Sequence, residues 1–400
     1  MKLIFESDTF SFELIRTMGY ALCKGADIGE CINTAYRIKD NDFQSWYSEW
    51  FKTAERTQQI ANICSQNGNR VSASEAYLRA SNYYRTAELF CREDSNEAKG
   101  EECYTKGREN FIKAVNSSEL TLEQVKIPYE NTTLPGYFFK VDNSGKSRPT
   151  LIAMTGYDGT AEELYFIIGH AAINRGYNVL AFEGPGQGAA LRFQKLYFRH
   201  DWENVVTPVV DYLLSRTDVD SKKIAIAGFS LGGYLAPRAV AFEHRISACI
   251  ANSGILSFLE GVLKEQANSE YIQNELKKED SVEINAAIKK RMETNTSLRW
   301  AIRSGFLNFN VNTPHKLLKE YNKFTLKGIT DKIKCPTLIC DSDEEHFFSD
   351  QSKKLFDLLK CDKEFIVFTE DEGAGLHCQA GAQSLSNQRI FDWLDKILNV

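Results

Sequence analysis

Residues 224–236 read IAIAGFSLGGYLA. This apolar run is typical of a buried strand; it ends in a Gly-x-Ser-x-Gly motif and continues directly into a helix-forming segment. A tight strand-to-helix turn holds its serine in a strained conformation that only small neighbours tolerate, here Gly228 and Gly232. The hydroxyl group then stands above the sheet, in front of a helix N-terminus that favours negative charge. In this setting the motif predicts that Ser230 is a nucleophile and not an incidental serine in a glycine-rich connection.

Strand and helix patterns alternate on both sides of this motif. Strands are expected at 150–154, 178–182, 223–227, 246–251, 336–340 and 364–368, preceded by a strand pair at 125–129 and 134–141. Helical patterns lie between them, at about 160–175, 201–216, 231–243, 350–360 and 380–398. Because the strands are almost continuously apolar, the alternation predicts an α/β fold in which helices flank both faces of a mostly parallel sheet.

Two regions depart from this alternation. Residues 1–120 carry helical patterns and almost no strand pattern; in 72–85, for example, alanines and tyrosines recur three or four residues apart. Residues 255–329 also lack a clear strand but contain several polar helical stretches. We therefore expect an N-terminal helical cap domain at 1–120 and a core domain at 121–400, with a helical lid inserted at about 255–329.

The composition limits the class of protein. The 400 residues are 43% hydrophobic and 26% charged, as in a globular protein, and the net charge of −6 argues against nucleic-acid binding. No apolar run approaches the roughly 18 to 20 residues that span a bilayer, and the N-terminus lacks the apolar stretch of a signal peptide. The ten cysteines are scattered without a CxxC pair, which favours reduced thiols in a cytoplasmic protein over disulfides or a zinc site.

A serine hydroxyl becomes a strong nucleophile only when a neighbouring base accepts its proton, and an acid holds that base in the correct tautomer. After a strand-turn-helix motif of this kind the acid and then the histidine follow along the chain. The histidines after Ser230 are His244, His315, His346 and His377. His377 alone follows the last expected strand, in a loop of small residues that reads EGAGLHC. We therefore expect His377 to be the base.

The acid is expected in the loop after the strand at 336–340, which reads DSDEEHFF over 341–348. Counting from the strand places Glu345 at the position where the acid usually stands on such a sheet. Asp343 is the competing candidate, because aspartate is the commoner acid in serine triads. The sequence favours Glu345 and leaves Asp343 as the alternative.

An oxyanion requires two backbone N–H donors. One is expected from Leu231, directly after the nucleophile, and the other from Tyr157, in the loop after the strand at 150–154. The glycine-rich stretch EGPGQG at 183–188 lacks the spacing of a nucleotide-binding loop, so we interpret it as a turn under the pocket. The sequence contains no phosphate-binding, zinc or calcium motif, and we expect no cofactor and no metal.

With these residues assembled, the chain resembles the α/β-hydrolase superfamily. Within it, the chain is similar to the group of the fermentation-respiration switch protein, 2,6-dihydroxypseudooxynicotine hydrolase and the fungal heptaketide-shortening (yellowish-green type) hydrolases. The motifs that carry the resemblance are GYDGT at 156–160, FEGPGQG at 182–188, GFSLGG at 228–233 and EGAGLHC at 372–378. Relatives usually have aspartate where this chain has Glu345. The resemblance implies an N-terminal helical domain that covers the active site, and a homodimer.

We expect a serine hydrolase, an esterase or a C–C hydrolase, that acts on an apolar or aromatic small molecule. The leaving group stays open: the resemblance suggests retro-Claisen cleavage of a β-diketone or polyketide-like substrate, and the alternative is an ordinary ester or thioester. A binding protein without catalytic activity on the same fold is the third hypothesis. Neither nucleic acid nor a membrane is expected as a partner.

Overall fold

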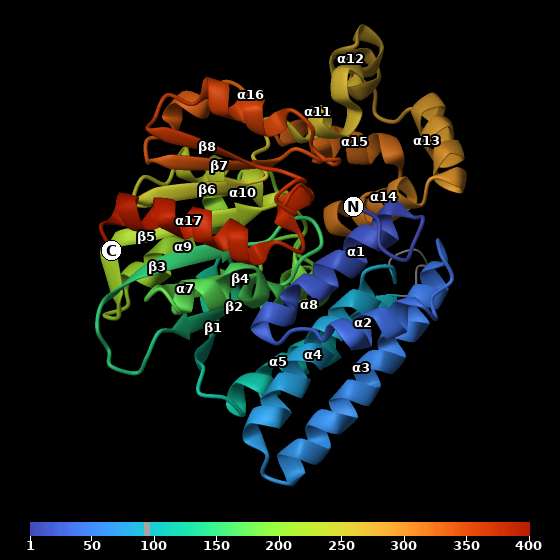
Figure 1. Ribbon diagram of the computed structural model, residues 1–400. Helices are drawn as coiled ribbons and strands as arrows, with labels where there is room; N and C mark the ends of the chain where they lie inside the picture. The colour runs from blue at the N-terminus through green and yellow to red at the C-terminus, as the bar shows by residue number, and fades with distance from the viewer. Residues whose placement is uncertain (92–96) are drawn as a thin grey trace.

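The computed structural model describes residues 1–91 and 97–400 and contains an eight-stranded sheet flanked by helices (Figure 1). The strand order is β1-β2-β4-β3-β5-β6-β7-β8. β1 pairs antiparallel with β2 and β2 with β4, whereas all the other neighbours are parallel. The strands are β1 (Thr121–Tyr129), β2 (Thr132–Lys140), β3 (Arg148–Met154), β4 (Asn178–Phe182), β5 (Val219–Phe229), β6 (Ala248–Asn252), β7 (Thr337–Ser342) and β8 (Lys363–Phe368). The expected mostly parallel sheet is confirmed.

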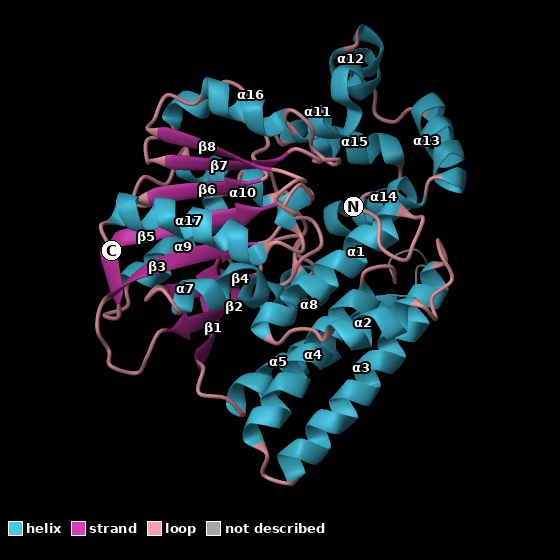
Figure 2. Cartoon of the chain, viewed as in Figure 1, coloured by secondary structure: helices cyan, strands magenta, loops and turns pink. Residues whose placement is uncertain are grey.

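Helices cover both faces of this sheet (Figure 2). Because side chains alternate along a strand, Ile152 and Met154 of β3 pack on one face and Leu151 and Ala153 on the other. The first face is covered by α9 (Glu203–Leu214), α10 (Gly232–Val240) and α16 (Gln351–Leu358). The second is covered by α6 (Ala161–Leu164), α7 (His170–Ile173) and α17 (Gln383–Leu398). The central strands are therefore buried on both sides, which explains their nearly unbroken apolar sequence.

The N-terminal region is helical and lies at the lower right of Figure 1. It consists of α1 (Asp8–Gly19), α2 (Ile28–Ala35), α3 (Phe43–Gln66), α4 (Arg70–Glu88) and α5 (Glu97–Asn116). Its aromatic core contains Trp46, Trp50 and Tyr83, all fully buried. These helices therefore have a hydrophobic core of their own beside the two cores of the sheet.

A second group of helices connects β6 to β7 and lies at the upper right of Figure 1. It contains α11 (Phe258–Leu263), α12 (Glu270–Lys277), α13 (Val282–Thr294), α14 (Thr296–Phe309) and α15 (Pro314–Lys323). Several begin with a serine, asparagine or threonine whose side chain accepts a backbone N–H of the first turn, as helix N-caps do. The polar stretches of this region are thus short, capped helices.

One helix was not expected from the sequence, and another is less regular than expected. The helix α8 (Gly188–Gln194) begins inside the glycine-rich stretch at 183–188, where only a turn was expected. The helix expected at 160–175 is interrupted by a five-residue π-helical segment, Tyr165–Gly169, between α6 and α7. Among the described residues, no helix combines the length and the apolar character that crossing a membrane would require.

Candidate active site

The Gly-x-Ser-x-Gly motif forms the sharp turn between β5 and α10. Ser230 has a φ of 58°, and its backbone N–H donates to Asn252 O at 2.6 Å. A Cβ atom on Gly228 would lie 2.0 Å from the carbonyl oxygen of Gly232. Glycine is therefore required for the turn to close, and the turn leaves the Ser230 side chain half-buried at the carboxyl end of the sheet.

His377 lies in the turn that follows β8 and is bonded to Glu345. The distance from His377 Nδ1 to Glu345 Oε2 is 2.5 Å, and both side chains are almost fully buried. The same carboxylate accepts from Ser253 Oγ at 2.7 Å and from the Phe347 N–H at 2.9 Å. All the bonds to Glu345 come from fixed groups, so the carboxylate holds the imidazole in one orientation.

The alternative acid, Asp343, lies elsewhere. Its side chain is exposed and accepts the Glu370 N–H at 3.0 Å, in the loop beside His377 but not on its ring. Among the described residues, none of the other histidines after Ser230 bonds to Glu345 through its ring. His244 is exposed, and His315 is buried against Glu275 O at 2.9 Å. His346 follows Glu345 in the chain, but its ring packs on that of Phe347 at 4.0 Å and lies 6.4 Å from that of His377.

The two members of the pair shift each other's pKa values. Burial alone would raise the pKa of Glu345, but His377 and the hydrogen bonds from His377, Ser253 and the Phe347 N–H lower it to about 2. Burial alone would lower the pKa of His377, but Cys378 and Glu345 raise it above its ordinary value. Glu345 is thus ionised at neutral pH, and its charge favours protonation of the imidazole.

Cys378 connects the histidine to the serine turn. Its Sγ accepts the Ser230 N–H at 3.2 Å, donates to Asn252 O at 3.4 Å and lies 3.5 Å from His377 Nε2. The ring nitrogen that Glu345 does not use therefore faces the same turn as the serine. No role for Cys378 was expected from the sequence, although it directly follows the predicted base.

Tyr157 and Leu231, the two expected oxyanion donors, are in loops that approach each other closely. A Cβ atom on Gly156, directly before Tyr157, would lie 2.6 Å from Leu231 N. The Tyr157 carbonyl accepts from Asn308 Nδ2 at 2.8 Å, and its phenol bonds to Tyr321 Oη at 2.7 Å. The loop is therefore anchored to the helices between β6 and β7, and Tyr157 also lines the cavity beside Ser230.

Ser230 and His377 line one cavity, with a volume of about 160 Å³. The helices between β6 and β7 supply an apolar wall that includes Phe258, Leu298 and Trp300. Phe258, Trp300 and Tyr321 are aromatic residues of this insertion that line the cavity, whereas Phe309 is buried in the core against Phe198 at a ring distance of 5.2 Å. The space beside the serine is thus largely apolar.

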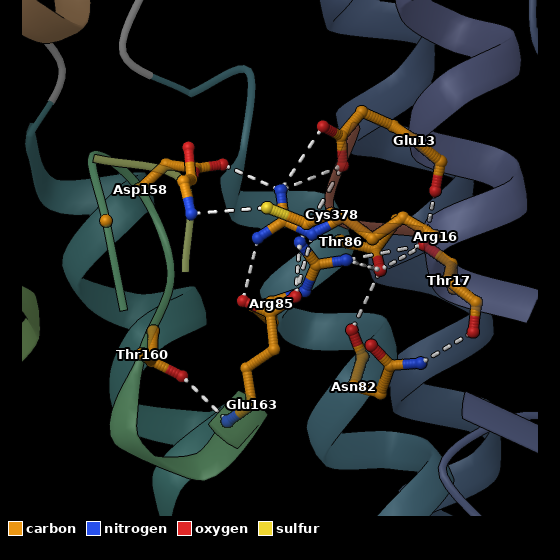
Figure 3. Close-up of polar contacts among 12 residues, drawn as sticks. Glu13, Arg16, Thr17, Asn82, Arg85, Thr86, Asp158, Thr160, Glu163 and Cys378 are labelled. Atoms are coloured by element: carbon orange, nitrogen blue, oxygen red, sulfur yellow. Dashed lines mark hydrogen bonds and ion pairs between the residues drawn. The ribbon is translucent and has the colours of Figure 1, made fainter. Parts of the chain in front are cut away.

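Helix α1 supplies the opposite wall. Phe12, Glu13 and Arg16 line the cavity, and the ring of Phe12 lies 6.3 Å from that of His377. Figure 3 shows the side chains of Glu13 and Asp158 turned toward the Arg16 guanidinium group. The contacts of Arg16 with Asp158 and Glu163 had no signal in the sequence of α1, because these partners are more than 140 residues away.

The glycine-rich stretch at 183–188 supports the site from below. The buried Glu183 accepts from Tyr104 Oη and from the Ala189 N–H, both at 2.7 Å. Gln187 Nε2 donates to the carbonyl of Thr155 at 2.9 Å. The stretch therefore fixes the loop after β3, in agreement with its interpretation as a structural turn. Among residues 1–91 and 97–400, no group of three or more His, Cys, Asp or Glu side chains could hold a metal ion.

The strand order of the sheet, the serine turn after β5 and the helices that connect the parallel strands define an α/β-hydrolase fold. Structural comparison agrees: the chain is similar to the 2,6-dihydroxy-pseudo-oxynicotine hydrolase, with a TM-score of 0.74 at 20% identity over 95% of both chains. AbyA5 is also similar in fold, with a TM-score of 0.60 at 15% identity over 92% of this chain and 97% of the other.

The chain belongs to the FrsA-like esterase family, whose sequence pattern matches residues 35–272. Hydrolase LUC6 of Fusarium sp is 34% identical over 418 residues, covering 100% of this chain and 99% of the relative. The 20-hydroxy-prefusarin hydrolase FUS2 of Gibberella moniliformis is 34% identical over 411 residues, covering 99% of this chain and 98% of the relative. The family resemblance expected from the motifs is confirmed, and the protein is a hydrolase.

Proposed function

We propose that this hydrolase uses Ser230 as nucleophile, His377 as base and Glu345 as the acid that orients the imidazole. The observation that carries the proposal is the 2.5 Å contact between His377 and Glu345 at the edge of a cavity that Ser230 also lines. A bond from Nδ1 to a carboxylate leaves Nε2 as the proton acceptor. Asp343 accepts a backbone N–H of the loop that leads to His377, and the proposal gives it no part in orienting the imidazole.

The proposed reaction begins when Ser230 Oγ attacks the substrate carbonyl carbon and gives its proton to His377 Nε2. The backbone N–H groups of Leu231 and Tyr157 stabilise the oxyanion. The tetrahedral intermediate collapses, the bond to the leaving group breaks, and the leaving group takes the proton from His377. Water then attacks the acyl-enzyme, again with His377 accepting and returning a proton, and Ser230 is regenerated.

The substrate that we propose is a small molecule with an apolar or aromatic body. The apolar wall of Phe258, Leu298 and Trp300 supports this class, and the named substrates of two similar proteins, 20-hydroxy-prefusarin and 2,6-dihydroxy-pseudo-oxynicotine, are small organic molecules. The helices over 255–329 are proposed to act as the lid.

We propose that the bond cleaved is the C–C bond of a β-diketone or polyketide-like compound. The same residues can cleave it because a stabilised enolate can leave and be protonated as an alcohol can. Ester or thioester hydrolysis is the alternative.

Two measurements test this function. A fluorophosphonate probe is expected to label the folded protein at Ser230 and to leave a Ser230→Ala variant unlabelled. Absence of labelling, together with no turnover of any carbonyl substrate, would leave only a binding role for the fold. Incubation with aryl β-diketones and with p-nitrophenyl esters distinguishes the leaving groups, since turnover of the esters alone would contradict C–C cleavage.

A further inference from the structure

The peptide unit between Gly156 and Tyr157 carries one of the two N–H groups that are proposed to bind the oxyanion. A peptide unit is planar, and its carbonyl and N–H groups point in opposite directions. Whatever holds the Gly156 carbonyl therefore also sets the direction of the Tyr157 N–H. Since a donor that is fixed before the reaction stabilises an oxyanion best, the partners of this peptide unit matter for catalysis.

Gln187 binds the Gly156 carbonyl. Its side chain is buried, and its Nε2 donates to Gly156 O at 3.2 Å and to Thr155 O at 2.9 Å. Its Oε1 accepts the Gly184 N–H at 3.1 Å. Both hydrogens of the amide nitrogen and its oxygen are thus bound to backbone groups, which hold the side chain in one orientation.

This contact directs the Gly156 carbonyl away from the cavity. Gln187 lies in the connection between β4 and α8 and is not among the described residues that line the cavity, whereas Tyr157 and Ser230 line it. The Tyr157 N–H, on the opposite edge of the peptide unit, is therefore turned toward the cavity side. A Cβ atom on Gly156 would lie 2.9 Å from Ser230 Cβ, so this peptide unit is directly beside the serine turn.

The carbonyl on the other side of Tyr157 is held by α14. Asn308 is fully buried, and its Nδ2 donates to Tyr157 O at 2.8 Å. The backbone carbonyl of Asn308 accepts the Phe198 N–H at 2.9 Å, which fixes Asn308 in turn. The Tyr157 phenol also donates to Ala301 O, in the same helix, at 2.8 Å. The peptide units before and after Tyr157 are thus held by different parts of the chain.

We infer that Gln187 and Asn308 are positioning residues that fix these two peptide units and so preorganise the Tyr157 N–H as an oxyanion donor. Neither side chain is among the described residues that line the cavity, so both act through Tyr157 and not on the substrate. Because Asn308 belongs to the helical insertion, that insertion helps to build the site as well as to cover it. The inference rests on the proposed function, in which an oxyanion forms at Ser230.

The experiment compares aryl trifluoromethyl ketones with the corresponding aryl methyl ketones, by titration calorimetry. With a trifluoromethyl ketone, Ser230 Oγ forms a bond to the carbonyl carbon, the serine proton passes to His377 and the carbonyl oxygen becomes an oxyanion. The methyl ketone binds without this step and reports only on the shape of the cavity. We expect the wild-type protein to bind the trifluoromethyl ketone at least about 100-fold tighter than the methyl ketone.

Gln187→Met and Asn308→Leu are each expected to reduce this ratio of affinities by about tenfold and to change the affinity for the methyl ketone less than about twofold. A merely structural role would weaken the binding of both ketones alike. The melting temperature of each variant shows whether it folds. Gln187→Glu and Asn308→Asp, which keep the shape of the side chain but lose the donors, replace a variant that unfolds.

Gln194→Met and Asn178→Leu are the matched controls. Gln194 Nε2 donates to Thr133 O at 2.8 Å, and Asn178 Nδ2 donates to Asp218 O at 3.0 Å. Each control therefore also removes a side-chain amide from a backbone carbonyl, but at residues that do not line the cavity. Neither control is expected to change the ratio of affinities.

The outcomes separate the positioning role from the proposed function. An unchanged ratio in both Gln187→Met and Asn308→Leu would overturn the inference, as would equal reductions in the controls. A reduction in only one of the two variants would remove the other residue from the role.

The proposed nucleophile is tested by the wild-type protein and by Ser230→Ala, which should bind the two ketones equally. A wild-type protein that binds the two ketones equally, or binds neither, contradicts the nucleophile and with it the positioning role. The same holds if Ser230→Ala keeps the preference. A preference that depends on Ser230 but persists in the Gln187 and Asn308 variants contradicts the positioning role alone.

Discussion

Two buried groups of charges meet at the same cavity, and they are built differently. On the sheet side, Glu345 uses its carboxylate to hold one nitrogen of His377 and leaves the other directed at the serine turn. On the helical side, Arg16 has both edges of its guanidinium group bound by Glu163 and Asp158. The first arrangement leaves Nε2 with only the long contact to Cys378 Sγ at 3.5 Å, whereas the second binds the guanidinium group to carboxylates on both edges. The two groups therefore differ in what they offer a substrate: the imidazole has a nitrogen that can accept a proton, whereas the guanidinium group holds the wall together.

Glu345→Gln is expected to have the largest effect, because it removes the charge that orients and supports the His377 imidazole. We expect kcat to fall by about 10³- to 10⁴-fold. Since Glu345 raises the pKa of His377, and activity requires the neutral imidazole, activity falls as pH drops through that pKa. In the variant, the decline of the remaining activity on the acid side of the pH profile should therefore occur at lower pH than in the wild type. A kcat/KM profile against pH measures both, and Asp343→Asn, at the exposed alternative, should leave them unchanged.

Arg16→Met tests the ion pairs of Arg16 with Glu163 and Asp158 through their effect on the free energy of unfolding. It removes the guanidinium group that binds Asp158 and both oxygens of Glu163, which keeps only Arg85 as a cation, at 3.4 Å, and we expect unfolding to become easier by about 3–5 kcal/mol. The matched surface change is Arg37→Met, which breaks a pair with Glu49 where the arginine is 39% exposed and should cost less than about 1 kcal/mol. Denaturant titration gives both values. Similar losses for the two variants would contradict the importance assigned to burial.

Gly156→Ala tests the contact between the two oxyanion loops. The added methyl group would lie 2.6 Å from Leu231 N, so the loop that carries Tyr157 must move. A displacement of this kind should lower kcat by about 100-fold and change KM little. Gly100→Ala is the control, since its Cβ would meet nothing closer than 3.7 Å. Unchanged kcat in Gly156→Ala would show that the Tyr157 N–H is not needed.

Cys378→Ala is expected to have the smallest effect. It removes one acceptor from the Ser230 N–H, while Asn252 O at 2.6 Å remains, and we expect a loss of about 1 kcal/mol, or less than tenfold in kcat. Cys378→Ser keeps an acceptor and should be closer to the wild type. Cys64→Ser, outside the cavity, controls for loss of a thiol. A loss of kcat as large as that of Glu345→Gln would mean that the thiol takes part in the chemistry.

The sheet side was largely predictable from the sequence, and the helical side was not. Apolar strands and the tight turn at Ser230 are local features, so periodicity and the glycines at 228 and 232 were enough to find them. In the loop with Glu345 and Asp343 the sequence favoured Glu345 but left Asp343 open, because which carboxylate faces His377 depends on how the loop folds over β7. The helix α8 was missed because its first residue, Gly188, belongs to a stretch with the composition of a turn.

The contacts of α1 could not be predicted for a different reason. Arg16 and Glu163 are 147 positions apart, so no periodic pattern in the sequence connects them. Burial of Arg16 is decided by how the helical region docks on the loop after β3. Expectations from a single sequence therefore placed the candidate nucleophile and base at the sheet edge and a helical domain over them, but not the side chains of α1 that line the cavity.

The ring contact between Phe12 and His377 joins the early and late parts of the polypeptide at one point. During synthesis, helix α1 leaves the ribosome hundreds of residues before His377, so this contact can form only late in synthesis. The contact therefore ties the position of helix α1 to a late part of the chain, next to the candidate base.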